Sequence, residues 1–288
     1  MKNVSLVAID FIDTELTKKA IEKTLLHFDP KEIIVFSNQN FFPGSKFIEI
    51  ESCSGWDQYN YLLNTASLNY VNTSHMLFLQ WDSWAVDSSC WTDDYLKYDY
   101  IGAPWPFREP WRSVGNGGFS LRSTRLMEIL SNDRFIQDAP KNEKHPEDTF
   151  ICIYLRKYLT EIKQIKFAPV SQAEKFSFEC ARPKHNTFGF HGAYGMPKFL
   201  SEEELYYYLK NKRPGFRFST HEFWQFLIRG IYDFKRYDLL DITRFFINRL
   251  NSEYFYLVKY FTMEIGVHDH FFNKMEAEEG VAPSTSGL

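Results

Sequence analysis

Short apolar runs alternate with amphipathic stretches along residues 4–80, and this alternation constrains the fold more than any other feature of the sequence. Buried strands are predicted at 4–9, 32–36, 46–50 and 75–80, with helices at 14–28 and 56–68. Asp29 ends the first helix, because Pro30 excludes the helical conformation from the residue before it. The pattern predicts an α/β fold: a mixed, mostly parallel sheet flanked by helices, with its ligand crevice at the carboxyl ends of the strands.

The rest of the chain separates into a continuation of this domain and a helical C-terminal region. Further strands are predicted at 98–101, 119–121 and 166–169, helices at 123–130 and 147–158, and a strand or irregular edge at 173–179. Ser201 and Glu204 have the capping-box spacing of a helix start, and amphipathic helices are expected near 202–211, 220–233 and 238–263. We expect a core domain over 1–200, a helical region over 201–275 and a disordered polar tail over 276–288.

Net charge and cysteine spacing exclude several classes of protein. The formal net charge of −4 and the pI near 6.1 argue against a general nucleic-acid binder. The four cysteines form no C-x-x-C pair, which favours buried thiols of a reducing compartment, although an even count leaves disulfides open. No stretch reaches the length of a transmembrane helix, and the first apolar run, broken at Asp10, is too short for a signal peptide. A cytoplasmic protein is expected.

Two segments near the middle of the chain place a polar or glycine-rich element beside an apolar stretch. Asp82 follows the strand predicted at 75–80, where its carboxylate could bind Mg²⁺ or Mn²⁺ or simply form a turn. Residues 115–118, Gly-Asn-Gly-Gly, let backbone N–H groups approach a ligand closely or form a tight turn before the next strand. They lack the G-x-G-x-x-G spacing and the Walker lysine, which excludes those nucleotide-binding motifs.

Two later segments carry ionisable groups. Glu147 and Asp148 follow Pro146 at a predicted helix start, where the helix dipole favours acidic residues and keeps Asp148 ionised, as a catalytic base requires. His191 lies in Phe-Gly-Phe-His-Gly (188–192), and an imidazole there is either structural or a ligand of a divalent metal. Together with Asp82 it could complete a metal site that keeps open positions for phosphate oxygens.

The succession of these segments resembles the GT-A glycosyltransferases, most closely a bacterial glycosyltransferase-like family of largely unassigned substrate, over about residues 1–200. That superfamily carries a metal-binding Asp-x-Asp after the fourth core strand; here the place reads Gln80-Trp81-Asp82, so only the second acidic position matches. Residues 117–120, Gly-Gly-Phe-Ser, are similar to the wall beside the donor sugar in galactosyltransferases and fringe-like enzymes. Residues 145–148 resemble the acidic segment that supplies the base in inverting members, and 190–192 resemble the late metal-binding histidine.

The resemblance implies a GT-A fold and a hexosyltransferase of bacterial surface polysaccharide synthesis that uses a nucleotide-sugar donor. Asp82 and His191 would bind a divalent metal, Mn²⁺ or Mg²⁺, that stabilises the departing diphosphate. Asp148, beside Glu147, would deprotonate the acceptor hydroxyl and give inversion at the anomeric carbon. The donor-binding residues would be Ile9, Asp10, Ser37, Asn38, Asp57, Asn60, Gln80, Gly117 and Gly118. Trp84, Trp105 and Trp111 would stack on sugar faces, unless they pack in the loops around Pro104 and Pro106.

The acceptor is expected to be a glycan or a lipid-linked molecule. An apolar face of the helix predicted at 220–233 could contact an anionic bilayer at the inner side of the membrane, the core domain or a second subunit; its residues are Phe223, Trp224, Phe226, Leu227 and Ile231. A rival function is a non-catalytic carbohydrate-binding or scaffold protein, in keeping with Gln80. A nucleotidyltransferase would need a glycine-rich basic loop near the N-terminus, which residues 9–13 do not provide.

Overall fold

The structure, a computed structural model, describes residues 2–51, 56–139, 146–212, 220–250 and 252–272. The chain divides into two compact units, Met1–Gly195 and Met196–Leu288, close to the boundary predicted at residue 200. The tail predicted at 276–288 lies outside the described residues. Within the described ranges, no helix is both long enough and apolar enough to cross a membrane.

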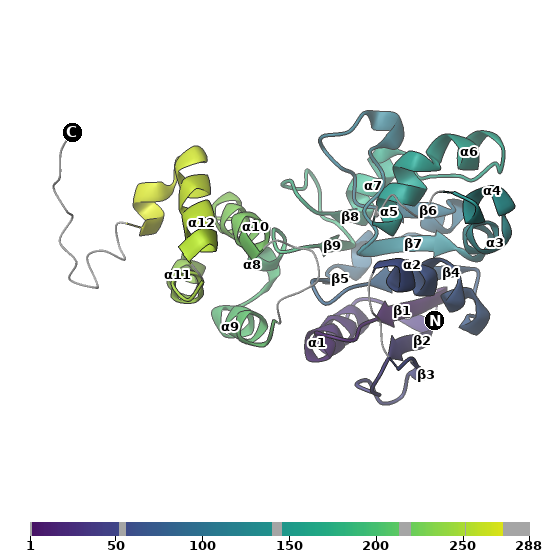
Figure 1. The fold of residues 1–288 in the computed structure, drawn as a ribbon, viewed down its shortest axis with the longest axis horizontal. Coiled ribbons are helices and arrows are strands. Elements are labelled where there is room, and N and C mark those ends of the chain that lie inside the picture. Colours follow the sequence, from purple (N-terminus) through teal and green to yellow (C-terminus); the bar gives the residue numbers. More distant parts are fainter. Residues whose placement is uncertain (1, 52–55, 140–145, 213–219, 251, 273–288) are drawn as a thin grey trace. The chain divides into compact units, whose positions relative to one another are not determined.

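A six-stranded mixed sheet forms the centre of the first unit, in the order β3-β2-β1-β4-β7-β6 (Figure 1). Four strands run parallel, β1 (Lys2–Ile9), β2 (Pro30–Ser37), β3 (Lys46–Glu49) and β4 (His75–Leu79). β7 (Phe119–Ser123) pairs antiparallel with both β4 and β6 (Tyr100–Gly102). A smaller sheet has the order β5-β9-β8, formed by β5 (Ser83–Ala85), β9 (Gly189–His191) and β8 (Ser177–Phe178).

Helices flank the large sheet and bury its apolar side chains. They are α1 (Thr14–Leu25), α2 (Trp56–Asn64), α3 (Thr124–Asn132), α4 (Arg134–Gln137), α5 (Glu147–Thr149), α6 (Arg156–Glu161) and α7 (Val170–Phe176). Val7 of β1 and Phe78 of β4 share one core cluster with Leu62 of α2, Leu126 of α3 and Leu159 of α6. The predicted α/β fold with a mixed sheet flanked by helices is therefore confirmed.

Aromatic rings pack between the two sheets and the neighbouring loops. The Phe188 ring centroid lies 5.7 Å from that of Phe119, 5.5 Å from that of Phe28 and 5.0 Å from that of Trp91. Such tilted and edge-on contacts add stability beyond the apolar area that they bury. Much of the unusually high aromatic content of the first unit therefore serves packing.

The second unit is helical. It contains α8 (Met196–Phe199), α9 (Glu202–Asn211), α10 (Thr220–Asp233), α11 (Leu240–Ile247) and α12 (Ser252–Glu264). The capping box at the start of α9 is confirmed, because Ser201 and Glu204 exchange side-chain-to-backbone hydrogen bonds of 3.2 and 2.9 Å. The prediction of a single helix over 238–263 is wrong. The N–H groups of Arg249 and Leu250 donate to the carbonyl oxygens of Phe246 and Ile247, three residues earlier, and this tighter turn ends α11 before α12 begins.

The apolar face of α10 is buried inside this unit. Leu227 and Ile231 are inaccessible to solvent, and Phe223 and Trp224 are 6% exposed. α10 packs against α8, α11 and α12, which accounts for the apolar spacing of its sequence. This face is therefore not available to a bilayer, and the predicted membrane contact through it is wrong.

Two local predictions in the first unit are also wrong. Residues 166–169 form no strand; only Phe167 makes an isolated parallel bridge, with Tyr100. The strand or irregular edge predicted at 173–179 is wrong over 173–176, which belong to the helix α7, whereas Ser177–Phe178 form the strand β8. Pro169 stands at the N-cap of α7, and the Gln, Ala, Glu and Lys that follow it favour helix. The helix predicted at 147–158 is interrupted by a π-helical turn over Phe150–Tyr154.

Candidate functional site

The candidate site lies where the parallel strands of the large sheet end. Leu79, the last residue of β4, pairs with Phe119, the first residue of β7, so the segment after β4 lies beside the glycine loop before β7. The Ser83 hydroxyl joins the two segments by donating to the carbonyl oxygen of Gly118, 2.8 Å away. This carboxyl edge of the strands is where an open α/β sheet presents its ligand crevice.

Asp82 and His191 meet at this edge, as the sequence predicts. Ser83 of β5 pairs with His191 of β9, and the Asp82 carboxylate oxygen Oδ1 lies 3.5 Å from Nε2 of His191. Both residues are only 5% exposed. A Cβ atom on Gly118 would lie 2.1 Å from the same ring nitrogen, so the imidazole occupies space that only glycine leaves open.

Further polar groups surround the His191 ring. Nδ1 lies 3.0 Å from Oε1 of Glu179 and 2.9 Å from Nδ2 of Asn116, and Nε2 lies 3.2 Å from Oε1 of Gln80. Burial lowers the pKa of His191, but the carboxylates of Asp82 and Glu179 outweigh burial and hold the pKa well above its ordinary value. The imidazole therefore carries a positive charge between two carboxylates.

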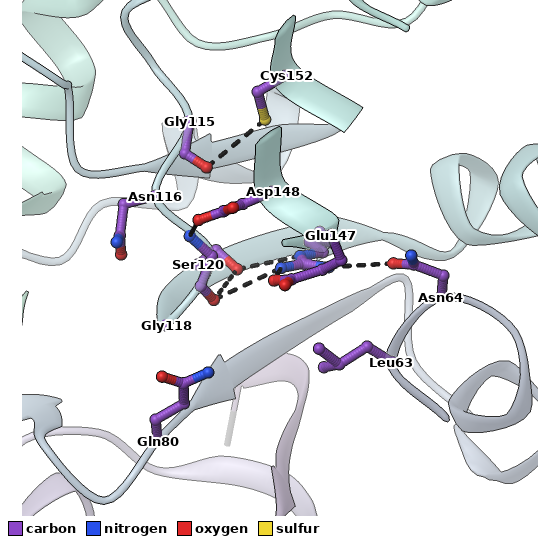
Figure 2. Close-up of polar contacts among 12 residues, drawn as sticks. Leu63, Asn64, Gln80, Gly115, Asn116, Gly118, Ser120, Glu147, Asp148 and Cys152 are labelled. Atoms are coloured by element: carbon purple, nitrogen blue, oxygen red, sulfur yellow. Dashed lines mark hydrogen bonds and ion pairs between the residues drawn. The ribbon is translucent and has the colours of Figure 1, made fainter. Parts of the chain in front are cut away.

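Asp148 approaches the same glycine loop from α5. Its Oδ2 accepts a hydrogen bond from the N–H of Gly117 over 3.0 Å, and its Oδ1 accepts one from the N–H of Thr149 over 2.6 Å. Figure 2 shows the Asp148 carboxylate pointing toward the loop that carries Asn116 and Gly118. Burial, reinforced by the Glu147 and Glu179 carboxylates, raises the pKa of Asp148 to about 7. A carboxyl group with that pKa exchanges a proton readily near neutral pH.

Glu147 has a different environment from its neighbour. Its Oε1 lies 2.9 Å from Nη2 of Arg122, and this ion pair is almost completely buried. The Arg122 guanidinium also donates to the hydroxyl of Ser120 and to the side-chain oxygen of Asn64 (Figure 2). Glu147 therefore anchors α5 to β7, and its carboxylate is already engaged, which leaves Asp148 as the acidic residue presented to the glycine loop.

Gly117 leaves room for this arrangement. A Cβ atom there would lie 2.2 Å from Oε1 of Glu147 and 3.0 Å from the Cβ atom of Asp148. Consecutive glycines thus contact opposite sides of the site: Gly117 touches the acidic pair on α5, and Gly118 touches His191. The structure therefore brings Asp82, Asp148 and His191 to one short loop.

The residues predicted to bind the donor at the ends of β1 and β2 are mostly occupied with local structure. The Asp10 carboxylate accepts hydrogen bonds from the N–H groups of Ile12 and Asp13 and from the Thr17 hydroxyl, and burial raises its pKa. The side chain of Ile9 is buried in the core. In this conformation, the Asp10 carboxylate shapes the start of α1.

The other predicted donor-binding residues differ in exposure. Ser37 is inaccessible, and its hydroxyl lies 3.4 Å from Oδ1 of the exposed Asn38. Asn60 on α2 is partly buried. The side chain of Asp57 lies outside the described residues. Gln80 connects α2 to the site, because its amide nitrogen donates to the hydroxyl of Tyr59 over 3.0 Å.

The three tryptophans predicted to stack on sugars have separate environments. Trp84 is 3% exposed, and its ring packs edge-on against Phe190 at 4.5 Å, so the sugar-stacking role is wrong for this residue. Trp105 is 7% exposed and packs against Gly115, where a Cβ atom would lie 2.2 Å from the ring. Trp111 is 58% exposed, with the Arg112 guanidinium 5.3 Å from its ring centroid.

Three residues of the site are not identified by the sequence reasoning. Asn116 and Glu179 hold His191, and Arg122 holds Glu147. A lone arginine inside the apolar run of β7 is a local signal for a buried ion pair, since arginine is almost never fully buried unless paired. No local signal marks Glu179; it reaches His191 because Phe178 of β8 pairs with Phe190 of β9.

The donor set of Asp82 and His191 fits a divalent ion only in part. The Asp82 Oδ1 is buried without a hydrogen-bond partner among the described residues, which leaves it for a cation. His191 can bind a metal ion through Nε2 only after the charged ring has lost a proton, while Glu179 engages Nδ1. Among the described residues, no group of three or more His, Cys, Asp or Glu could hold a metal ion. Mg²⁺ is commonly bound by one or two protein groups together with substrate phosphates and water, so two ligands suffice only when a donor diphosphate is present.

The chain matches a family of known sequences over about half of its length. A family described as protein of unknown function (DUF5672) matches residues 45–191, just over half of the sequence. The matched segment runs from the start of β3 to His191 and contains Asp82, Gly117, Gly118, Asp148 and Glu179. A search of curated proteins found no match. The chain belongs to the DUF5672 family of proteins of unknown function.

Proposed function

We propose that this protein is a GT-A glycosyltransferase that transfers a sugar from a nucleotide-sugar donor to a glycan or lipid-linked acceptor, in bacterial surface polysaccharide synthesis. One observation carries the proposal: Asp148 and the Asp82–His191 pair lie against consecutive glycines at the carboxyl edge of the sheet. A carboxyl group with a pKa of about 7 on one side suits a general base, and the carboxylate and imidazole of the Asp82–His191 pair on the other side suit a site for the donor diphosphate.

In the proposed reaction, Asp148 acts as the general base. Its carboxylate takes the proton of an acceptor hydroxyl while that oxygen attacks the anomeric carbon and the bond to the donor diphosphate breaks, which inverts the anomeric centre. The hydrogen bond from Gly117 orients the carboxylate, and the Arg122–Glu147 ion pair fixes the backbone that carries it. Near pH 7 about half of the Asp148 population is ionised and able to accept the proton.

The leaving group is proposed to bind at Asp82 and His191. These two side chains would hold a divalent cation, which when bound neutralises charge on the departing diphosphate. Glu179 orients the buried ring through Nδ1, and Gly118 lets the loop before β7 pack directly on the ring. Gln80 stands at the first acidic position of the Asp-x-Asp pattern and contributes a neutral oxygen instead.

A panel of nucleotide sugars, assayed with Mg²⁺ and Mn²⁺ for donor hydrolysis and for transfer, tests the proposal. A glycosyltransferase releases the nucleoside diphosphate from at least one donor, and exhaustive chelation lowers that rate if Asp82 and His191 hold a metal. The rival carbohydrate-binding or scaffold function is favoured by Gln80 and predicts saturable donor binding without release of the diphosphate. That result would end the proposal.

We also propose that the protein contacts a membrane or a second subunit through α12. Exposed side chains at positions 256, 260 and 263 form one stripe: Tyr256 is 67%, Tyr260 70% and Met263 52% exposed. Flotation of the full chain with anionic liposomes, combined with its sedimentation in solution, distinguishes the two partners. Replacing Tyr256 and Tyr260 with serine should abolish whichever association the wild type shows, and an unchanged association would remove α12 from this role.

A further inference from the structure

A pocket of about 380 Å³ lies beside the candidate site in the first unit. Its walls come from residues 104–113 and 170–184. Glu179 lines this pocket and also contacts His191, with Oε1 3.0 Å from Nδ1. Trp105 lines it as well, and its ring packs against Gly115 at the start of the glycine loop. The pocket therefore shares two residues with the surroundings of the proposed catalytic centre.

The charges around this pocket favour an anionic ligand. Three cationic side chains line it, Arg108, Arg182 and Lys184, against two acidic ones. Both acids are already engaged: Glu174 forms an ion pair with Lys184 at 2.8 Å, and Glu179 lies against the charged His191. Within the described part of the chain, no salt bridge includes Arg108 or Arg182. The Arg108 guanidinium lies 5.4 Å from the Phe107 ring centroid, a contact that leaves its N–H donors able to bind a ligand.

A buried hydroxyl on the same wall adds a second, independent observation. Ser177 lines the pocket and is inaccessible to solvent. Its Oγ has no hydrogen-bond partner among the described residues. A buried hydroxyl without a partner is costly, and an oxygen-rich ligand in the pocket would satisfy it. Planar guanidinium groups bind phosphate oxygens in a bidentate way, and two arginines line this pocket.

We propose that this pocket binds a phosphate group carried by the acceptor substrate. The inference rests on the proposed function, because it places the acceptor on the Glu179 side of the His191 ring and the donor on the Asp82 side. Arg108 and Arg182 would hold the phosphate, Ser177 would donate to it, and Trp105 would face the attached sugar or chain. The phosphate can belong to a soluble sugar phosphate or to a lipid phosphate.

Binding of glucose 1-phosphate and of glucose, measured by calorimetry on the full chain, tests the pocket. We expect the phosphate to bind and glucose not to bind. The double variant Arg108→Gln/Arg182→Gln should weaken phosphate binding by roughly tenfold or more, since charge-assisted hydrogen bonds are lost. The matched control is Lys166→Gln/Lys175→Gln, which removes two exposed lysines of the same unit outside the pocket and should leave binding unchanged.

Equal losses in the two double variants, or no loss in either, would overturn the pocket assignment, as would equally tight binding of glucuronate. Vesicles of phosphatidylcholine with and without a polyprenyl phosphate distinguish a lipid phosphate from a soluble sugar phosphate. Binding that depends on the lipid phosphate and on the two arginines identifies a membrane-borne acceptor. Binding of the soluble phosphate alone identifies a soluble acceptor. Failure of the proposed function is distinguishable, because nucleotide-sugar turnover would then be absent while phosphate binding still depended on Arg108 and Arg182.

Discussion

The backbone N–H of Gly117 donates a hydrogen bond to the carboxylate of Asp148 over 3.0 Å, across a distance of about thirty residues in the chain. The next residue, Gly118, packs directly on the His191 ring. Two neighbouring glycines thus set the positions of an acidic and a basic group that come from α5 and β9. Any side chain at either glycine would separate these groups.

Asp148 should make the stability of the protein depend on pH. Its pKa in the folded state is raised to about 7 from an ordinary value of 3.8, so the folded chain binds the proton more tightly than the unfolded chain. The resulting stabilisation is fully present below the unfolded pKa and is lost as pH rises through about 7. Asparagine does not titrate, so the Asp148→Asn variant should not lose this stability as pH rises.

Thermal melting of the wild type and Asp148→Asn, followed from about pH 4 to about pH 8, measures the effect. We expect the variant to gain stability relative to the wild type as pH rises. A difference in melting temperature that stays constant over this range would contradict the raised pKa. If Asp148 is the base, we also expect the rate of sugar transfer to rise with pH, with an apparent pKa near 7.

Removing one partner of the ion pair between Arg122 and Glu147 should destabilise the protein more than removing both. Glu147→Gln leaves the fully buried guanidinium of Arg122 without its counter-charge, at a cost of about 3–5 kcal/mol in the free energy of unfolding. The double variant Arg122→Met/Glu147→Leu removes both charges and should restore most of that loss. Urea denaturation gives both values, and Glu161→Gln on the exposed surface of α6 serves as a control with an effect of about 0.5 kcal/mol or less. A double variant as unstable as Glu147→Gln would contradict this interpretation.

Gly118→Ala should damage the site through His191. The added methyl group would lie 2.1 Å from Nε2, so the ring must move away from Asp82 and Gln80. We expect lower stability and a loss of donor binding. Replacing His191 with alanine in the same chain removes the obstacle, so the stability losses of the two substitutions should not add. Strictly additive losses, measured by denaturation, would show that the clash is not the cause.

Two tryptophans should respond in opposite ways to substitution. Trp84→Ala removes a core ring that is 3% exposed and should cost about 3–5 kcal/mol. Trp111→Ala removes an exposed ring that contacts Arg112, and it should change stability little. If Trp111 contacts a sugar, its substitution should weaken acceptor use at nearly unchanged stability. Acceptor kinetics of Trp111→Ala that match the wild type would leave this residue without a role in binding.

The strand–helix alternation of the sequence predicts most of the first unit, because apolar periodicity is set by the side chains that a strand or helix buries. It does not identify α7, because the helix propensity of residues 170–176 is offset by the apolar, strand-like run that follows them. It also joins α11 and α12 into one helix, since both carry the same apolar spacing and the break at Asn248–Leu250 involves no proline or glycine.

The candidate site is predictable only in part. Asp82 and His191 stand at the ends of apolar runs and Asp148 at a helix start, and the structure brings them to one loop as predicted. Glu179 and Arg122 contribute as much to the site. Arg122 is marked by its place inside the apolar run of β7, but no local pattern marks Glu179, which reaches His191 through the pairing of β8 with β9. Trp84 shows the opposite error: its position after β4 indicates a site residue, while the aromatic packing around Phe190 places it in the core.

Turnover and donor binding of Asp148→Asn, measured together with the donor that the nucleotide-sugar panel identifies, test the assignment of the base most directly. Asparagine has nearly the same shape but cannot accept the acceptor proton. We predict that kcat falls by roughly 10²–10⁴-fold while the dissociation constant of the donor stays nearly unchanged. A variant that keeps near-normal turnover would contradict the proposed role of Asp148.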